Sequence, residues 1–258
     1  MEIRGSHVMI TGCNRGIGKA VALMCAADGA HLHIVNRKAD QALEEELTQA
    51  GAASLKFYQL DLSQRANIDQ FLKDTKDLQI DILFNNAGLL TGGLLENQTV
   101  DEIYAMLQVN VNALIHLTHG FLPRMIARKR GKIINHASVT GVMHFPCATT
   151  YAASKAAVIA FTDSLRAELK GTGVTTLVLV TPGIETDMYK DIPNRYGKNI
   201  DLTFIKGMPP KKYAQMIREA ILEDLDVLKP QGFSGVGVLM AQHAPKLFEN
   251  LVLKRFQR

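Results

Sequence analysis

Short apolar runs alternate with amphipathic stretches along most of this chain. The apolar runs predict buried strands at 7–10, 31–35, 55–60, 80–84, 132–136 and 174–180. Between them, apolar residues recur with a helical period over 16–28, 39–50, 64–77, 101–128 and 151–170. Regular alternation of strands and helices is typical of parallel strands joined by right-handed crossovers. The pattern therefore predicts a doubly wound α/β sheet with helices on both faces. No change in composition marks a second domain, so we expect residues 1–258 to form one.

Two later segments leave this alternation. Residues 187–209 form a long polar stretch, and we expect the region 187–225 to act as a lid over a ligand site. The region 235–258 is a C-terminal tail, whose apolar residues from Pro245 onward follow a helical period beside four basic residues, Lys246, Lys254, Arg255 and Arg258. Such a helix can pack within the protein, pack on a partner subunit or lie on a membrane surface. We favour packing within the protein or on a partner over the membrane surface.

Composition narrows the range of functions. The 258 residues are 47% hydrophobic, and 29 basic against 25 acidic residues give a mild net charge of +4, so nucleic-acid binding is not indicated. No apolar stretch is long enough to span a membrane, and we expect no signal peptide. The cysteines, Cys13, Cys25 and Cys147, are odd in number and lack metal-ligand spacing. We therefore expect free thiols, a cytoplasmic location and no metal site.

A glycine-rich turn lies between the first predicted strand and helix. It reads Thr11-Gly-Cys-Asn-Arg-Gly-Ile-Gly18 and has the spacing Gly-x3-Gly-x-Gly, which differs from the common G-x-G-x-x-G fingerprint. Glycines let the backbone approach a pyrophosphate, and the helix start offers free N–H groups. A tight turn with a close helix contact would also explain them. We favour a dinucleotide site whose first residues are Gly12, Asn14, Arg15, Gly16, Ile17 and Gly18.

The ends of the next strands indicate which dinucleotide binds. The second strand ends in Asn36-Arg37, where an NAD enzyme usually has an acid for the ribose 2′-hydroxyl. Arg37 and Arg15 suit a 2′-phosphate instead, although they could simply be exposed loop residues. NADP(H) is therefore favoured over NAD(H). Asp61, next to Leu62, could accept a hydrogen bond from the adenine amino group or cap a helix. The fourth strand ends in Asn85-Asn86-Ala87-Gly88, which could pack beneath the cofactor.

Together these motifs resemble the classical short-chain dehydrogenase/reductase family. The resemblance covers about residues 5–190 and includes the glycine turn, Asp61, Asn-Asn-Ala-Gly at 85–88, Asn110, Ser138, Tyr151-Ala-Ala-Ser-Lys155 and Pro182-Gly183, in the family's order and spacing. With the alternating pattern, it leads us to expect a single Rossmann-type domain with a mostly parallel seven-stranded sheet. It also implies a dimer or tetramer formed through the helices at 101–128 and 151–170.

The resemblance implies a catalytic tetrad of Asn110, Ser138, Tyr151 and Lys155. A free tyrosine has a pKa near 10, and a lysine four residues later on one helix face would favour the phenolate and lower that pKa. Ser138 could donate a hydrogen bond to the substrate oxygen. The family further implies that Lys155 and Tyr151 contact the nicotinamide ribose and that Asn110 holds a proton-relaying water. Taken singly, each residue could be an ordinary surface, turn or helix residue.

One motif departs from the family's pattern. The stretch Pro182-Gly183-Ile184-Glu185-Thr186 has one residue fewer than usual before its threonine. We expect the Ile184 backbone to contact the nicotinamide carboxamide, and the role of Thr186 is open. Met143, His144 and Met188 could line an apolar substrate pocket with Ser138 and Tyr151, and ordinary packing explains the first three equally well.

These features favour an NADP(H)-dependent oxidoreductase that interconverts a carbonyl and an alcohol on a small lipophilic substrate. One alternative is a non-catalytic NADP(H)-binding regulator or scaffold, which would usually show a broken tetrad. Another is a sugar-nucleotide epimerase or dehydratase, which shares the Tyr-x-x-x-Lys chemistry but usually has a larger C-terminal domain.

Overall fold

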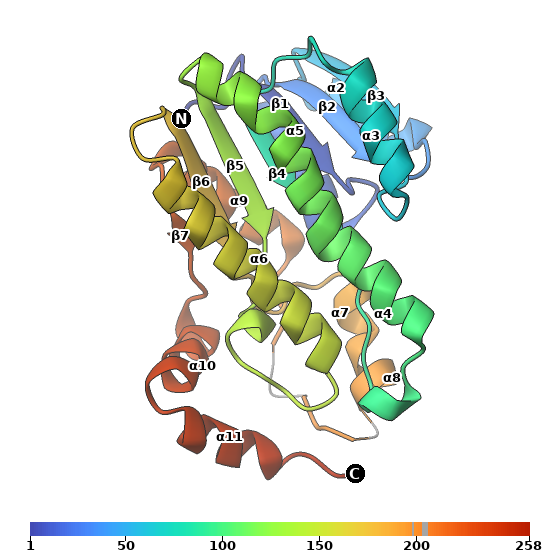
Figure 1. Cartoon of the computed structure of the whole chain (residues 1–258), viewed down its shortest axis with the longest axis vertical. Coiled ribbons are helices and arrows are strands. Elements are labelled where there is room, and N and C mark those ends of the chain that lie inside the picture. The colour runs from blue at the N-terminus through green and yellow to red at the C-terminus, as the bar shows by residue number, and fades with distance from the viewer. Residues whose placement is uncertain (198, 203–205) are drawn as a thin grey trace.

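A seven-stranded parallel sheet forms the centre of the molecule (Figure 1). The computed structural model of the chain describes residues 1–197, 199–202 and 206–258. The strands are β1 (His7–Thr11), β2 (His31–Asn36), β3 (Ser54–Gln59), β4 (Ile82–Asn85), β5 (Gly131–His136), β6 (Val174–Leu179) and β7 (Val227–Leu228). They lie in the order β3-β2-β1-β4-β5-β6-β7, and every neighbouring pair is parallel. The six strands predicted from the pattern are present with ends within two residues of those expected.

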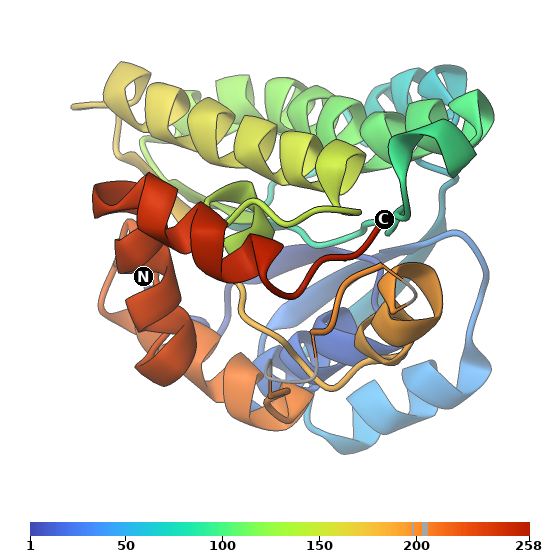
Figure 2. The ribbon, with the colours of Figure 1, turned by 90° about the horizontal axis from the view of Figure 1, so that it is seen from below.

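Helices cover both faces of this sheet. On one face lie α1 (Gly16–Ala27), α2 (Gln41–Gln49) and α9 (Pro210–Leu222), and on the other lie α3 (Arg65–Asp74), α5 (Ala113–Ala127) and α6 (Thr149–Glu168) (Figure 2). Side chains of a strand alternate between its faces. Accordingly, Val8 and Ile10 of β1 join the apolar core beneath α1 and α9, whereas Met9 joins the core beneath α5. This alternation produces the predicted doubly wound arrangement.

The long helix expected over 101–128 is interrupted. It consists of α4 (Val100–Leu107), a π-helical turn over Gln108–Asn112, and α5. Asn110, in the π turn, is buried, and its side chain forms hydrogen bonds with segments outside the helix. A π turn widens a helix by one residue and is frequent at functional sites. The expectation of one regular α-helix was therefore wrong at the position that carries a predicted site residue.

The segment after β6 holds two short helices before α9. These are α7 (Asp187–Lys190) and α8 (Ile192–Tyr196), and residues 198 and 203–205 of the expected lid lie outside the described residues. α9 buries five residues, most of them apolar, against α1 and the sheet. α9 is therefore a layer of the core and not part of a lid. The candidate lid is reduced from 187–225 to 187–209.

Two helices beyond the sheet complete the chain. They are α10 (Gly232–His243) and α11 (Pro245–Leu253), which contact each other at the end of the molecule opposite the N-terminus (Figure 1). The pattern predicted a helix from Pro245 but did not predict α10 or the two-residue strand β7. None of the helices in the described part of the chain combines the length and apolar character needed to cross a bilayer.

Candidate active site

The glycine turn joins β1 to α1 and packs tightly on the end of β4. Gly12 and Gly16 have φ of +73° and +61°, in the left-handed region that favours glycine. A Cβ atom on Gly12 would lie 3.0 Å from the Cα atom of Ala87, and one on Gly18 would collide with the carbonyl oxygen of Gly12. The backbone can therefore follow this path only without side chains at these positions.

The start of α1, at Gly16, is left open for an anion. The N-cap residue, Arg15, has extended backbone and makes no capping hydrogen bond with its side chain, and the first turn holds no acid. In contrast, Asp40 caps α2 and Thr99 caps α4. Uncapped N–H groups and the positive end of the helix dipole together favour a phosphate.

The end of β2 offers further donors next to this turn. Asn36 accepts a hydrogen bond from the Cys13 N–H at 2.7 Å, and its amide nitrogen is buried with no partner among the described residues. An orphaned buried donor fits a bound hydrogen-bond acceptor. Arg37 is exposed beside it, and Asn14 donates to the Lys38 carbonyl at 3.4 Å. The glycine turn, the open helix start and these donors fit a dinucleotide.

Arg15 is engaged by an acid in the structure. Its guanidinium lies 3.1 Å from the carboxylate of Asp187, the first residue of α7, and both side chains are exposed. This pair joins the glycine turn to the candidate lid. Thr186, the preceding residue, lies over Gly16, since its methyl group would be 3.1 Å from a Cβ atom there.

Asp61, just beyond β3, forms a local turn. Its carboxylate accepts the Ser63 N–H at 2.9 Å, and hydrogen bonds from Ser63 lower the pKa of Asp61. The residue is half-buried, and the neighbouring Leu62 is buried. The alternative of a helix cap was wrong, because Gln64 holds the N-cap position of α3 and no side chain caps that helix. Whether Asp61 contacts adenine stays a prediction.

Asn86, Ala87 and Gly88 tie the end of β4 to the glycine turn. The Asn86 amide donates to the carbonyls of Thr11 and Gly12, at 2.9 and 3.0 Å. The Thr11 hydroxyl accepts the N–H groups of both Asn86 and Ala87. These bonds fix the floor of the site between β1 and β4.

Asn110 and Lys155 meet beside this floor. The Asn110 oxygen accepts the Leu89 N–H at 2.8 Å, and its amide donates to the Leu89 carbonyl and to the hydroxyl of Ser154, one residue before Lys155. A Cβ atom on Gly88 would lie 3.3 Å from the Asn110 oxygen and 3.8 Å from the Lys155 Nζ. The π turn and α6 therefore bring two residues of the expected tetrad to one place.

Tyr151 and Ser138 complete the same group. Lys155 Nζ lies 5.6 Å from the centre of the Tyr151 ring, as expected for residues one helical turn apart on α6. Ser138 follows β5 and forms a side-chain hydrogen bond with Tyr151, and its hydroxyl accepts the Thr140 N–H at 3.1 Å. The four residues predicted from separate motifs are thus brought together near the carboxyl ends of β4 and β5.

The pKa of Tyr151 differs from the expectation. Burial raises it to about 12, and the hydrogen bond with Ser138 opposes this only in part. Burial also lowers the pKa of Lys155, to about 8. The prediction that the lysine would lower the tyrosine pKa was wrong for the protein by itself, because desolvation penalises both charged forms.

His136, at the end of β5, is a site residue that sequence reasoning missed. Lys155 Nζ donates to its carbonyl oxygen at 2.8 Å, and its ring Nδ1 lies 3.0 Å from the Asn86 oxygen. Because the Asn86 amide already donates elsewhere, the ring must donate here. Burial and the charge of Lys155 lower the pKa of His136 to about 3, so the ring is neutral. Its position two residues before Ser138 was the available signal.

The shortened Pro182–Thr186 stretch still reaches the glycine turn. Gly183 and Glu185 exchange backbone hydrogen bonds with Met208, and Ile184 is buried. Thr186 caps α7 by accepting the Tyr189 N–H at 3.2 Å. Its methyl group faces Gly16, so the missing residue does not remove Thr186 from this region.

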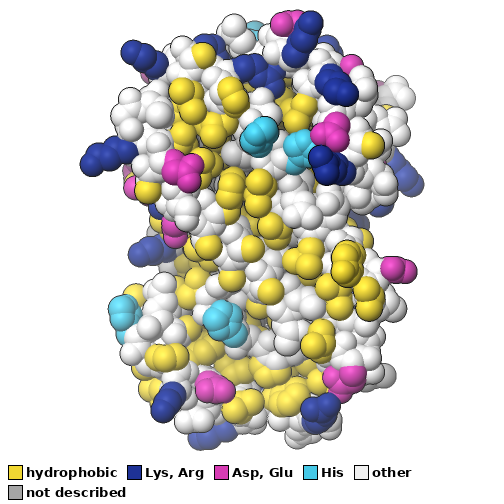
Figure 3. Space-filling view, viewed as in Figure 1, with side chains coloured by type: hydrophobic (Ala, Val, Ile, Leu, Met, Phe, Trp, Pro, Cys, Tyr) yellow, Lys and Arg dark blue, Asp and Glu magenta, His cyan; other side chains and the backbone are white. Residues whose placement is uncertain are grey.

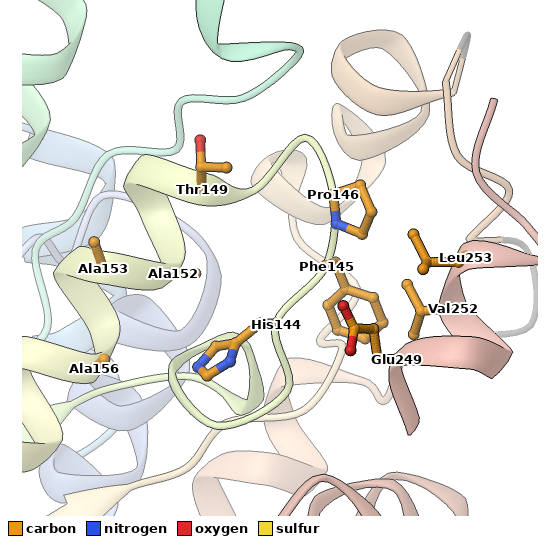
Figure 4. A pocket seen from close by; sticks show the side chains of 10 residues that line it. All are labelled: His144, Phe145, Pro146, Thr149, Ala152, Ala153, Ala156, Glu249, Val252 and Leu253. Atoms are coloured by element: carbon orange, nitrogen blue, oxygen red, sulfur yellow. The ribbon is translucent and has the colours of Figure 1, made fainter. Parts of the chain in front are cut away.

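The expected substrate residues do not all gather at Tyr151. Met143 is buried in an apolar cluster beneath α10, and Met188 is partly exposed on α7. His144 lines a separate cavity of about 440 Å³ between α6 and α11 (Figure 4). Alanines 152, 153 and 156 form its α6 side, and Glu249, Val252 and Leu253 form its α11 side. None of the four tetrad residues lines this cavity.

Comparisons with known proteins agree with this geometry. A family model described as short chain dehydrogenase matches residues 6–197. A 3-oxoacyl-(acyl-carrier-protein) reductase of Synechocystis sp. is 35% identical over 191 residues, covering 71% of this chain and 76% of the relative. Dehydrogenase/reductase SDR family member 7B of Rattus norvegicus is 30% identical, covering 99% of this chain and 83% of the relative.

A solved structure extends the likeness to the whole fold. A short-chain dehydrogenase from Sphingobium yanoikuyae in complex with NADPH superposes with a TM-score of 0.77 at 25% identity, covering 98% of this chain and 97% of that chain. The chain belongs to the short-chain dehydrogenase/reductase family of oxidoreductases.

Proposed function

We propose that this protein is an NADP(H)-dependent oxidoreductase that interconverts a carbonyl and a secondary or primary alcohol on a small lipophilic substrate. The observation that carries the proposal is the meeting of Asn110, Ser138, Tyr151 and Lys155 beside the uncapped start of α1. When bound, a nicotinamide would supply the hydride for carbonyl reduction. The residues of the chain would then have to bind, orient and protonate the substrate.

The geometry supports a distinct task for each residue. A raised pKa keeps the Tyr151 hydroxyl protonated at neutral pH, so it can give its proton to a developing alkoxide. Ser138, bonded to Tyr151, can donate a hydrogen bond to the same oxygen. Lys155 is buried behind them and Asn110 is fixed by three hydrogen bonds, so both are held ready to position water and ribose hydroxyls.

Several groups support NADP(H) rather than NAD(H). Arg37 is exposed at the end of β2, Arg15 lies in the glycine turn, and the buried Asn36 at the strand end provides no carboxylate for a ribose 2′-hydroxyl. The NADPH complex of the Sphingobium yanoikuyae relative is consistent with this preference. Arg15, Arg37 and Asn36 would together receive the 2′-phosphorylated ribose.

The exposed face of α4, α5 and α6 supports a homodimer or homotetramer. Figure 3 shows apolar side chains over this face with basic side chains mainly around it. Val100, Tyr104, Leu107 and Ile126 are all at least 36% exposed. Apolar patches rimmed by polar residues are typical of protein interfaces.

Replacing Tyr151 by phenylalanine tests the proposed chemistry. We expect Tyr151→Phe to lower kcat for carbonyl reduction by about 10²- to 10⁴-fold, since it removes the proton donor but keeps the ring. NADPH binding, followed by the change in its fluorescence, should be unchanged. A variant that keeps most of its turnover with a panel of ketones and aldehydes would contradict the mechanism.

Replacing Arg37 by alanine tests the cofactor preference. The loss of one charge-assisted hydrogen bond should weaken NADPH binding by about 10- to 100-fold and leave NADH binding nearly unchanged. Lys38→Ala is the matched control, because it removes the neighbouring exposed cation. Equal losses for NADPH and NADH, or an equal effect of Lys38→Ala, would refute the role of Arg37.

A further inference from the structure

The α10–α11 pair has one side packed on the site region. Gly237 of α10 packs on Met143, since a Cβ atom there would lie 2.7 Å from the methionine Cε. Phe248 of α11 packs edge to face on Phe145, with ring centres 5.8 Å apart. These contacts hold both helices against the loop that follows Ser138. The two helices are therefore packed on the rest of the fold and cover one side of the site region.

The opposite side of this pair is apolar and exposed. Six of the fifteen exposed large hydrophobic side chains in the described residues belong to α10 and α11, and they are 44–70% exposed: Phe233, Val236, Leu239, Leu247, Leu251 and Leu253. The first three recur every three residues, and Leu247 and Leu251 are four apart, so each set follows one side of its helix. Exposed apolar side chains that gather in this way suit contact with another apolar phase.

The positive charge of the chain is concentrated in the same segment. Residues 229–258 contain five basic residues and one acid, whereas residues 1–228 contain 24 of each. The basic residues are Lys229, Lys246, Lys254, Arg255 and Arg258. The single acid, Glu249, points into the cavity that it lines with Ala152 of α6 (Figure 4). The excess charge of +4 is thus local in the sequence. In the structure Glu249 is exposed, and Arg255 and Arg258 pair with Asp201 and Glu96. Among the described residues, Lys246 and Lys254 are therefore left as the unpaired cations of α11 and its end.

Apolar and basic side chains share this surface. Lys254 lies three residues after Leu251 and seven after Leu247, which places it on the same side of the C-terminal helical segment. Among the described residues, Lys246 and Lys254 are exposed and form no ion pair. The lower end of the molecule in Figure 3, where α11 lies, shows apolar side chains with basic and a few acidic side chains among them.

We propose that this surface docks on an anionic lipid bilayer. We call it the docking face and define it by Phe233, Val236, Leu239, Leu247 and Leu251 with Lys246 and Lys254. A bilayer interface receives exposed apolar side chains, and acidic headgroups attract the lysines among them. A twofold contact of the face with a second copy would instead bring the lysines of both chains together, which charge repulsion opposes.

Docking would place the lid and the site beside the lipid. The tail beyond α11 pairs with the candidate lid: the Asp201 N–H donates to the Arg255 carbonyl at 3.1 Å, and the Gln257 N–H donates to the Asn199 carbonyl at 2.6 Å. A lipophilic substrate dissolved in the bilayer would then reach the protein next to the lid. This consequence rests on the proposed function, whereas the docking itself does not.

Vesicle sedimentation tests the docking face with the full-length protein. We expect the wild type to sediment with vesicles of phosphatidylcholine and phosphatidylserine, to sediment much less with phosphatidylcholine alone, and to be released by salt. Lys246→Glu with Lys254→Glu should lower the partition coefficient by at least about tenfold. Leu247→Gln with Leu251→Gln should lower it by a similar factor.

The matched control reverses the same charge elsewhere. Lys73→Glu with Lys76→Glu changes two exposed lysines near the end of α3 and gives the same net charge. We expect it to bind acidic vesicles nearly as well as the wild type binds them and clearly better than the Lys246 and Lys254 variant does. Circular dichroism confirms that each variant is folded.

Three results would overturn the proposal. One is that the wild type fails to sediment with acidic vesicles, and another is that reversing the charge of either lysine pair has the same effect on binding. The third is that the wild type does not bind vesicles and Leu247→Gln with Leu251→Gln lowers the oligomeric state in sedimentation velocity. The docking face would then be a contact between copies of the chain. Failure of the proposed function would instead appear as absent NADPH oxidation with vesicle binding retained.

Discussion

At the scale of single residues, the ion pair of Arg15 with Asp187 competes with the proposed cofactor contact. The Arg15 guanidinium cannot keep its ion pair with Asp187 and at the same time form a full bidentate contact with a 2′-phosphate. The carboxylate, 3.1 Å away, also adds a negative charge where a phosphate would bind. Cofactor selectivity therefore depends on the lid residue as well as on the glycine turn.

Removing this carboxylate should improve NADPH binding. Exposed ion pairs contribute about 0.2–1 kcal/mol, so Asp187→Asn should lower the Kd for NADPH by about two- to fivefold and leave the Kd for NADH unchanged. Isothermal titration with both cofactors measures the two constants. Glu185→Gln is the control, since it removes an exposed acid two residues earlier. Equal tightening of both cofactors, or the same gain from Glu185→Gln, would contradict this role of Asp187.

The site residues that could be predicted from sequence are those with fixed spacing. Tyr151 and Lys155 are four residues apart, so they share a helix face whatever surrounds them. The glycines of the turn are required because a Cβ atom at Gly12 or Gly18 would collide with neighbouring backbone. The pKa of Tyr151 could not be predicted, because it depends on burial by segments far away in sequence. The role of His136 could not be predicted for the same reason, since its partners Asn86 and Lys155 come from the end of β4 and from α6.

At the scale of elements, Tyr196 fastens α8 to the loop after β4. The ring is 4% exposed, its hydroxyl donates to the Thr91 carbonyl at 2.8 Å, and it occupies the space that a side chain on Gly92 would need. Burial raises the pKa of Tyr196, with a further contribution from nearby Tyr151. The packing of Tyr196 on Gly92 thus anchors the candidate lid close to Tyr151 of the tetrad.

A methyl group at Gly92 should loosen this anchor. Gly92→Ala would drive a Cβ atom into the Tyr196 ring, and overpacking of this kind costs about 1–3 kcal/mol. We expect KM for the carbonyl substrate to rise at least about fivefold, with faster proteolysis in the segment 187–202. Steady-state kinetics and limited proteolysis measure the two effects.

A double mutant shows whether the ring is responsible. Tyr196→Ala removes the ring, so Gly92→Ala should add little when combined with it. Tyr196→Phe keeps the ring and should lose only the contribution of the hydrogen bond to Thr91. Fully additive effects of Gly92→Ala and Tyr196→Ala would show that the glycine acts elsewhere.

The elements themselves were predictable where their pattern is long and local. Six strands and five helical stretches follow from periodicity, whereas the two residues of β7 are too few to show a period. The π turn at Asn110 could not be predicted, because the partners that hydrogen-bond Asn110, Leu89 and Ser154, lie far from it in sequence and no local pattern encodes them. α10 is apolar on both its packed and its exposed sides, which blurs the amphipathic signal.

At the scale of the whole molecule, the two ends of the sheet have different tasks. The tetrad and the glycine turn lie at the carboxyl ends of the strands, as is usual for ligand sites of doubly wound sheets. Near the opposite end, Lys132 is the second residue of β5 and is fully buried. Its Nζ lies 2.5 Å from the carboxylate of Asp224 and 3.3 Å from the Thr175 hydroxyl. This pair joins the chain after α9 to the middle of the sheet.

The buried lysine makes the stability of the molecule depend on Asp224. Burial raises the pKa of Asp224, but the hydrogen bond and charge of Lys132 outweigh it, so the net pKa is lowered. A carboxyl with a lowered folded pKa contributes stability that is complete above its unfolded pKa of about 3.9 and is lost as the pH falls through the folded value. At pH 7 the contribution is therefore fully present.

Neutralising Asp224 should destabilise the fold without touching the site. Asp224→Asn keeps a residue that tolerates the φ of +54° found there but leaves Lys132 buried without its counter-charge. We expect the free energy of unfolding at pH 7 to fall by about 1.5–3 kcal/mol, measured by urea denaturation. Asp163→Asn, which breaks a pair with the exposed side of Arg166, should cost less than about 1 kcal/mol.

A second substitution separates lost attraction from an uncompensated charge. Lys132→Met in the Asp224→Asn protein removes the stranded ammonium and fills similar volume, so most of the stability should return, because an apolar pair is often as stable as a buried ion pair. The difference between Asp224→Asn and wild type should also shrink as the pH falls below about 4, the unfolded pKa, and vanish as it passes the lower folded pKa at which Asp224 becomes protonated. If the double variant is as unstable as Asp224→Asn alone, the loss comes from the turn after α9 and not from the charge on Lys132.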